Sequence, residues 1–139
     1  MSTSLAPYLN FRGNAREAME FYQQVLGGEL TASSFADFGM PVGPGEDALI
    51  MHSQLITSAG FTLMGSDVPS HMEFAAGTNN FSVSLSGDDH EQLAGYWVKL
   101  CDGADITTPL DKAPWGDSFG MLTDRFGVSW IVNISKPTI

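Results

Sequence analysis

Apolar residues recur at helical spacing in two separate stretches of the chain. In residues 17–28 one helical face carries the apolar side chains of Ala18, Phe21, Tyr22, Val25 and Leu26. In residues 92–103 the matching face carries Leu93, Trp97, Leu100 and Cys101. A spacing of three and four residues is typical of an amphipathic helix, and Gly27 and Gly103 are typical helix ends. The pattern predicts two helices that each bury one face.

The two predicted helices also resemble each other, at an offset of 75 residues. Each begins with a capping pattern: Asn14 with Glu17 in the first copy, and Asp89 with Gln92 in the second. Such pairs satisfy backbone N–H groups that have no partner inside the helix. A repeated unit of this kind indicates an internal duplication of the chain.

Segments of alternating apolar and polar residues surround each predicted helix and indicate strands. In the first half they are Leu5–Phe11, Glu29–Phe35, Ala48–Thr57 and Phe61–Gly65. In the second half they are Phe81–Ser86, Ile106–Leu110, Phe119–Thr123 and Val128–Ile134. We therefore predict an α+β fold of two βαβββ modules in one domain, residues 1–139. The expected boundaries are module 1 at 4–67, a connector at 68–78 and module 2 at 79–136.

The alternation also predicts which side chains face the helices. The more apolar set should do so: Leu9, Phe11, Phe61, Leu63, Phe81, Val83, Leu85, Trp130 and Val132. The opposite set carries Ala6, Tyr8, Asn10, His52, Gln54, Thr62, Met64, Ser82, Ser84, Ser86, Ser129, Ile131 and Asn133. A mixed face with almost no charge is typical of a cavity wall for a small, partly apolar ligand. The alternative is a sheet face packed against the other half or a second subunit.

Composition excludes several partners. Six basic against sixteen acidic residues give a formal charge of -10, which argues against nucleic acid and anionic membranes as partners. No run of about 20 apolar residues is present, so we expect no membrane span. Cys101 is the only cysteine, which excludes an intramolecular disulfide and a cysteine-based zinc site. Without a recognisable secretory signal at the start, we expect a cytoplasmic protein.

Several motifs resemble a known family. They are the opening Pro7–Ala18, the stretch Phe21–Gly28, Met51-His52, Leu63–Asp67, and the late block Thr123–Trp130. With paired βαβββ modules, these residues resemble the PhnB-like branch of the vicinal oxygen chelate superfamily, which includes glyoxalase I, extradiol dioxygenases and bleomycin- and fosfomycin-resistance proteins. The resemblance implies cup-shaped mixed sheets, a homodimer, and active or binding cavities inside the cups.

The resemblance also raises the question of a metal. In metal-dependent relatives, His and Glu side chains from the first and last strands hold a divalent ion. The corresponding positions here are Ala6, Met64, Ser82 and Ile131. Zn²⁺, Ni²⁺ and Fe²⁺ prefer imidazole, carboxylate or thiolate ligands, which these positions lack. We therefore expect no metal and no other cofactor, with a divalent metal as the alternative.

His52 is the histidine with a functional position, because it lies mid-strand on the predicted cavity side. It fits a hydrogen-bonded core residue, a ligand contact or a proton-transfer group, since an unperturbed imidazole titrates near neutral pH. His71 and His90 fit exposed loop and helix-start positions. Asp124–Gly127 is typical of a hairpin turn in which Gly127 takes an unusual backbone angle.

The residues favour a binding protein over an enzyme, with a small-molecule ligand that the sequence does not identify. The predicted ligand-binding residues are Tyr8, Asn10, His52, Gln54, Met64, Ser82, Ser84, Trp115 and Ile131. Phe38 and Met40, in the loop Asp37–Asp47, are expected near the mouth. One alternative is a lyase, isomerase or dioxygenase that uses His52 as a weak catalytic candidate, or an unrecognised metal site. A second alternative is a dimerisation module without a ligand.

Some relatives of the PhnB-like branch are named as ubiquinone-biosynthesis methyltransferases. The sequence has no glycine fingerprint of a dinucleotide-type fold that would hold S-adenosylmethionine. A Gly-x-Ser-x-Gly nucleophile motif is also missing. Methyl transfer is therefore not an activity that these residues predict.

Overall fold

A computed structural model of the 139-residue chain describes residues 5–74 and 81–135. The chain divides into two compact units, Met1–Ala76 and Gly77–Ile139. Residues 75–78 of the predicted connector lie outside the described residues, as do residue 4, residues 79–80 and residue 136 of the predicted modules. In the part of the chain that is described, neither helix is long and apolar enough to cross a bilayer.

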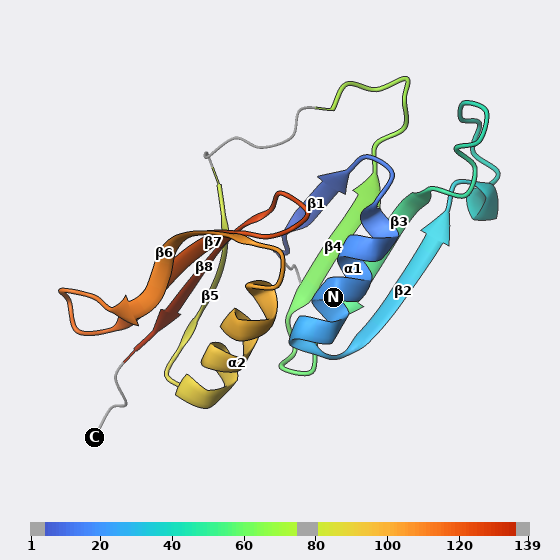
Figure 1. The fold of residues 1–139 in the computed structure, drawn as a ribbon. Coiled ribbons are helices and arrows are strands. Elements are labelled where there is room, and N and C mark those ends of the chain that lie inside the picture. Colours follow the sequence, from blue (N-terminus) through green and yellow to red (C-terminus); the bar gives the residue numbers. More distant parts are fainter. Residues whose placement is uncertain (1–4, 75–80, 136–139) are drawn as a thin grey trace. The chain divides into compact units, whose positions relative to one another are not determined.

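The first unit contains a four-stranded mixed sheet and one long helix (Figure 1). Its elements are β1 (Tyr8–Phe11), α1 (Ala15–Leu26), β2 (Glu29–Ser34), the short 3-10 helix η1 (Ala36–Phe38), β3 (Ile50–Ile56) and β4 (Thr62–Asp67). The strand order is β1-β4-β3-β2, with β1 parallel to β4 and the other neighbours antiparallel.

The second unit repeats this arrangement. Its elements are β5 (Val83–Gly87), α2 (His90–Leu100), β6 (Asp105–Lys112), β7 (Ser118–Thr123) and β8 (Ser129–Ile134). The strand order is β5-β8-β7-β6, and β5 is parallel to β8 as β1 is to β4. The prediction of an α+β fold with two βαβββ modules is therefore confirmed.

In each unit the helix covers one face of its own sheet. Helix α1 buries its apolar stripe, which consists of Ala15, Ala18, Met19, Phe21, Tyr22, Val25 and Leu26. Helix α2 buries Leu93, Tyr96, Trp97 and Leu100. The strands contribute alternate residues to the same cores, among them Leu9, Phe11, Leu55, Leu63, Leu85, Leu122, Trp130 and Val132. We call the opposite side of each sheet its helix-free face.

Two of the residues expected on the helix side are exposed. Phe61 is 45 % exposed and Phe81 is 66 % exposed. Both precede the first residue of their strands, β4 and β5, so the alternation of the strand does not extend to them. The prediction was wrong at these two positions because it continued the strand period past the strand ends.

The start of α1 is capped by a residue far away in the sequence. The Asn14 side chain makes no capping hydrogen bond. Instead, Asp67 Oδ1 accepts hydrogen bonds from the N–H groups of Gly13 (2.8 Å) and Ala15 (3.0 Å). At α2 the predicted cap is confirmed, because Asp89 Oδ1 accepts from Gln92 N–H at 3.0 Å. The carboxylate of Asp67 therefore joins the last strand of the first unit to its helix.

The predicted turn at Asp124–Gly127 is also confirmed. Asp124 Oδ1 accepts from the N–H groups of Phe126 and Val128, and Oδ2 accepts from Trp130 Nε1 at 2.8 Å. Gly127 has a φ of 86°, the left-handed region in which glycine is favoured. Asp124 is 4 % exposed, so its contacts are those of a turn and core residue.

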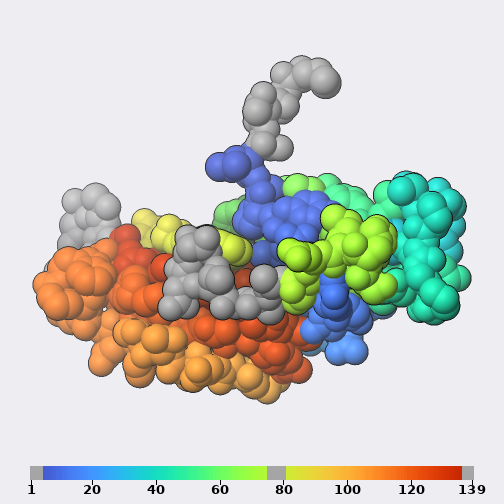
Figure 2. Space-filling view, turned by 90° about the horizontal axis from the view of Figure 1, so that it is seen from above, coloured from blue at the N-terminus to red at the C-terminus, as the bar shows by residue number. Residues whose placement is uncertain are grey.

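The loop between η1 and β3 is attached to the segment that follows β4. Glu46 accepts from Ser70 Oγ at 2.8 Å and from Ser70 N–H at 3.0 Å. Figure 2 shows these two stretches of the first unit beside each other, in teal and light green. The Ser70 hydroxyl is the main cause that lowers the pKa of the Glu46 carboxyl. The contact holds the base of the loop that carries Met40.

Candidate functional site

The helix-free face of the first sheet gathers five of the residues predicted to bind a ligand. Strand register places Met64 between Tyr8 and Gln54, with Thr31 beyond Gln54. The neighbouring row contains Asn10, Ser66, His52 and Ser33. None of these eight residues is Lys, Arg, Asp or Glu. The two rows therefore form a surface of amide, hydroxyl, aromatic and thioether groups.

Tyr8 and His52 are in contact on this face. The Tyr8 hydroxyl lies 3.3 Å from His52 Nδ1, and the ring centroids are 5.8 Å apart. Tyr8 is 42 % exposed and His52 is half-buried. A neutral imidazole has one donor and one acceptor nitrogen, so this contact engages one of them and leaves Nε2 for another partner. The pair is suited to bind, or to exchange a proton with, an oxygen-bearing molecule.

The other predicted ligand-binding residues belong to the second unit. Ser84 is exposed on β5 and is paired with Ile131 on β8, which is half-buried. Ser82 lies just before β5, and its hydroxyl is 2.9 Å from that of Ser129. Trp115 is 60 % exposed in the turn between β6 and β7, with its ring 5.4 Å from that of Phe119. These residues extend along the helix-free face of the second sheet.

Both apolar residues expected near the mouth of a cavity are exposed. Phe38 ends η1 and is 54 % exposed, and Met40 follows in the loop at 48 %. Phe35, three residues before Phe38, is buried and accepts from Met40 N–H through its carbonyl. The loop therefore has one buried anchor and presents two apolar side chains at its surface.

The four positions that the family resemblance would assign to a metal site carry poor ligands. Ala6 and Ile131 have no donor atom, Met64 offers a soft thioether, and Ser82 a neutral hydroxyl that already contacts Ser129. Divalent transition ions prefer imidazole, carboxylate or thiolate. Among residues 5–74 and 81–135, no group of three or more His, Cys, Asp or Glu is placed to hold a metal ion. The donor set at these positions does not fit such an ion.

Cys101 is not an activated nucleophile in this fold. It lies at the end of α2 and is half-buried. Burial raises the pKa of the Cys101 thiol, so the thiolate is disfavoured at neutral pH. Cys101 was predicted on the buried stripe of the helix, but it follows the last residue of α2 and is only partly buried.

Sequence patterns did not single out several polar residues beside the predicted ones. Ser66 and Ser33 lie in the His52 row of the first unit. In the second unit Asp117 Oδ2 accepts from Asn133 Nδ2 at 3.1 Å, and Asp111 pairs with Phe119 across β6 and β7. Strand parity gives the face of Ser66 and Asn133. It gives no indication for Asp117, which lies in a turn.

The fold of both units is the one found in the vicinal oxygen chelate superfamily. A family model described as 3-demethylubiquinone-9 3-methyltransferase matches residues 3–133, and the chain therefore belongs to this PhnB-like family. Protein YjdN of Escherichia coli (strain K12) is 30 % identical over 142 residues, which cover 95 % of each chain.

Solved structures agree with this assignment. Protein PA1353 from Pseudomonas aeruginosa is 37 % identical, with a TM-score of 0.82 over 98 % of this chain and 100 % of that one. A PhnB protein from Bacillus cereus, described as a putative 3-demethylubiquinone-9 3-methyltransferase, is 25 % identical, with a TM-score of 0.76 over 96 % and 100 %. A glyoxylase/bleomycin resistance protein/dioxygenase domain from Frankia sp. EAN1pec shares the fold, at 14 % identity and a TM-score of 0.64 over 98 % and 99 %.

Proposed function

We propose that this chain is a homodimeric, cytoplasmic protein that binds a small, partly apolar molecule on its helix-free faces without a metal ion. The contact between Tyr8 and His52, with Gln54 in the same row as Tyr8, is the observation that carries the proposal. A sheet face that is only solvated usually carries Lys and Glu. Aromatic, thioether, amide and hydroxyl groups together are typical of ligand sites.

The metal-free part of the proposal follows from donor chemistry. Met64, Ser82 and Ile131 stand where a metal-dependent relative would need strong ligands. The hydrogen-bonding groups of the first unit would then polarise and orient the ligand directly. A role in sequestering a compound, similar to that of resistance proteins with this fold, is an analogy with those proteins.

Methyl transfer, the activity in the family's description, is not what we propose. The enzymes that use a glycine fingerprint to hold a nucleotide-like cofactor have an open, largely parallel sheet with helices on both faces. Here each sheet is mixed and carries one helix.

A second candidate function is acid–base catalysis on an activated carbonyl or aromatic compound, with His52 as base and Tyr8 at the substrate oxygen. The 3.3 Å contact favours it.

His52→Ala is expected to weaken ligand binding by about 5- to 10-fold, because it removes one hydrogen-bonding group from the ligand. The measurement is an NMR titration of chelator-treated protein with aromatic fragments that carry a carbonyl, hydroxyl or amide group. Amide signals of Tyr8, His52 and Gln54 should shift as the tightest fragment binds. His90→Ala, a change of the same kind at the exposed start of α2, should bind as the wild type does.

Two results separate the alternatives. If none of the fragments shifts these signals, the helix-free face is a packing surface and the proposal is wrong. The second candidate function is correct if the bound fragment is converted to product and His52→Ala abolishes the conversion while fragments still bind. The protein is then an enzyme and not only a binding protein.

A further inference from the structure

Phe119 is the centre of a small group of side chains on the helix-free face of the second sheet. Across the sheet it is paired with Asp111 on β6 and with Asn133 on β8. Trp115 lies against its ring edge-on, with the centroids 5.4 Å apart and the planes at 71°. Asp117 accepts the hydrogen bond from Asn133 at 3.1 Å. We call Asp111, Trp115, Asp117, Phe119 and Asn133 the Phe119 cluster.

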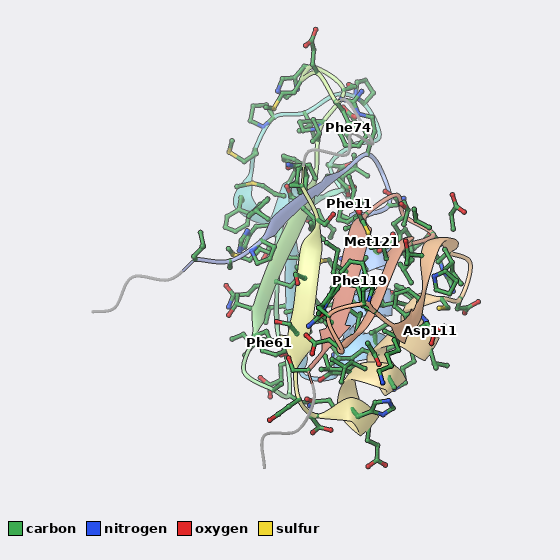
Figure 3. The ribbon with its side chains drawn as sticks, turned by 90° about the vertical axis from the view of Figure 1, so that its left-hand side faces the viewer. Phe11, Phe61, Phe74, Asp111, Phe119 and Met121 are labelled. Carbon is green, nitrogen blue, oxygen red and sulfur yellow. The ribbon has the colours of Figure 1, made fainter. Side chains whose placement is uncertain are left out.

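The Phe119 cluster lies at one end of the sheet and includes an exposed aromatic side chain. Trp115 is 60 % exposed, while Phe119 and Asn133 are half-buried. Met121 lies two residues after Phe119 on β7, so the two side chains lie on the same face of the sheet. Both residues are labelled in Figure 3. The turn that carries Trp115 is closed by hydrogen bonds from Ala113 N–H to the Asp117 carbonyl and from Gly116 N–H to the Ala113 carbonyl. The indole is thus presented on a defined turn.

The charges around this face have one sign. Three of the described Lys and Arg residues belong to the second unit, and of these Arg125 pairs with Asp102. Lys99 belongs to helix α2. Lys112 is paired with Ser118, and Ser118 with the buried Ile134, which places Lys112 on the helix side. The described basic residues of the second unit are therefore elsewhere, and Asp111 and Asp117 supply negative charge within the Phe119 cluster.

We infer that the Phe119 cluster selects an organic cation: a molecule with a protonated amine or quaternary ammonium group joined to an aromatic or alkyl body. The indole of Trp115 offers the aromatic face that attracts a cation most strongly. The carboxylates of Asp111 and Asp117 add attraction for the charge, and Met121 and Phe119 add apolar contact. This inference rests on the proposed function, since it names the class of ligand that the helix-free faces bind.

A charge series with one aromatic body tests the inference. The probes are phenethylamine, 2-phenylethanol and phenylacetate, which are cationic, neutral and anionic at pH 7. Binding is followed by NMR through the indole N–H signal of Trp115 and the backbone amides of the Phe119 cluster. We expect phenethylamine to bind at least about fivefold more tightly than 2-phenylethanol, and phenylacetate to bind most weakly. The advantage of the cation should decrease as salt is added.

Single substitutions test which residues of the Phe119 cluster cause the preference for the cationic probe. Asp111→Asn and Asp117→Asn should each reduce the preference for phenethylamine over 2-phenylethanol by about threefold, because each removes one nearby charge. Trp115→Ala, followed through the backbone amides, should weaken phenethylamine binding by about 3- to 30-fold. Glu91→Gln removes the same charge from an exposed position of α2 and should keep the full preference. The backbone NMR spectrum of each variant shows whether it is folded.

Three results would count against the inference. Phenylacetate binding as tightly as phenethylamine at these signals overturns it and leaves the proposed function in place. The same holds if the probes shift only the signals of Tyr8 and His52. If no probe binds at either face, both the inference and the proposed function are contradicted.

Discussion

Trp130→Ala is expected to cost the second unit about 3–5 kcal/mol of unfolding free energy. Trp130 is 1 % exposed on β8, where it is paired with Leu122 on one side and Val83 on the other. Truncation removes the indole packing and leaves a cavity among these residues. It also removes the hydrogen bond from Trp130 Nε1 to Asp124 Oδ2, and the loss of this buried hydrogen bond costs additional free energy.

Chemical denaturation followed by circular dichroism measures this loss. Trp115→Ala deletes the same side chain from an exposed position and should change the unfolding free energy by less than about 1 kcal/mol. Trp130→Phe keeps most of the packing and should fall between the two, since it loses the hydrogen bond to Asp124. Equal effects of the two alanine substitutions would show that Trp130 is not a core residue of this unit.

Asp67→Ala is expected to destabilise the first unit by about 2–5 kcal/mol, because it removes three hydrogen-bond acceptor contacts at once. Asp67 is 4 % exposed. Its Oδ1 accepts from Gly13 and Ala15 at the start of α1, and its Oδ2 accepts from Ile50 N–H at 3.0 Å. A carboxylate at a helix N-terminus is also favoured by the helix dipole.

Amide hydrogen exchange tests the capping role of Asp67 at the N–H groups that donate to it. The N–H groups of Gly13, Ala15 and Ile50 should lose protection in Asp67→Ala beyond the global loss of stability. Asp47→Ala, at an exposed carboxylate of the same unit, is the matched control and should leave these three amides protected. Unchanged protection in Asp67→Ala would contradict the assigned cap.

Local patterns in the sequence predict the repeated part of the fold. Apolar spacing gave both helices, and the alternation of residues such as Leu9, Leu63 and Trp130 gave the faces of the strands. Both signals arise within a few residues of the chain, where the helical and extended periods act directly. The alternation no longer predicts burial at Phe61 and Phe81, because these two residues precede their strands and are exposed.

Long-range contacts are less accessible to such reasoning. The cap of α1 comes from Asp67, more than fifty residues after the helix starts, although Asn14 has the residue type and position of a local cap. The face of the sheet on which Asp111 lies could not be predicted either. The register of β6 and β7 shifts between Thr108 and Asp111, and a strand that was expected to end at Leu110 continues to Lys112. A shift of register changes which residues share a face.

The candidate site could be predicted in part. Alternation placed Tyr8 and His52 on one face, but their contact at 3.3 Å depends on the parallel pairing of β1 with β4. The pairing of first and last strands in a module is a property of the whole fold. Turn residues such as Asp117 have no periodic signal, so their part in the Phe119 cluster appears only in three dimensions.

Ligand binding without a metal is the central claim, and one calorimetric experiment tests it most directly. The protein is dialysed against a chelator and titrated with the tightest-binding fragment, before and after addition of one equivalent of Zn²⁺, Ni²⁺, Mn²⁺ or Fe²⁺. We predict the same affinity and stoichiometry in every titration. Binding that is lost in the chelator-treated protein and restored by one of these ions would contradict the account.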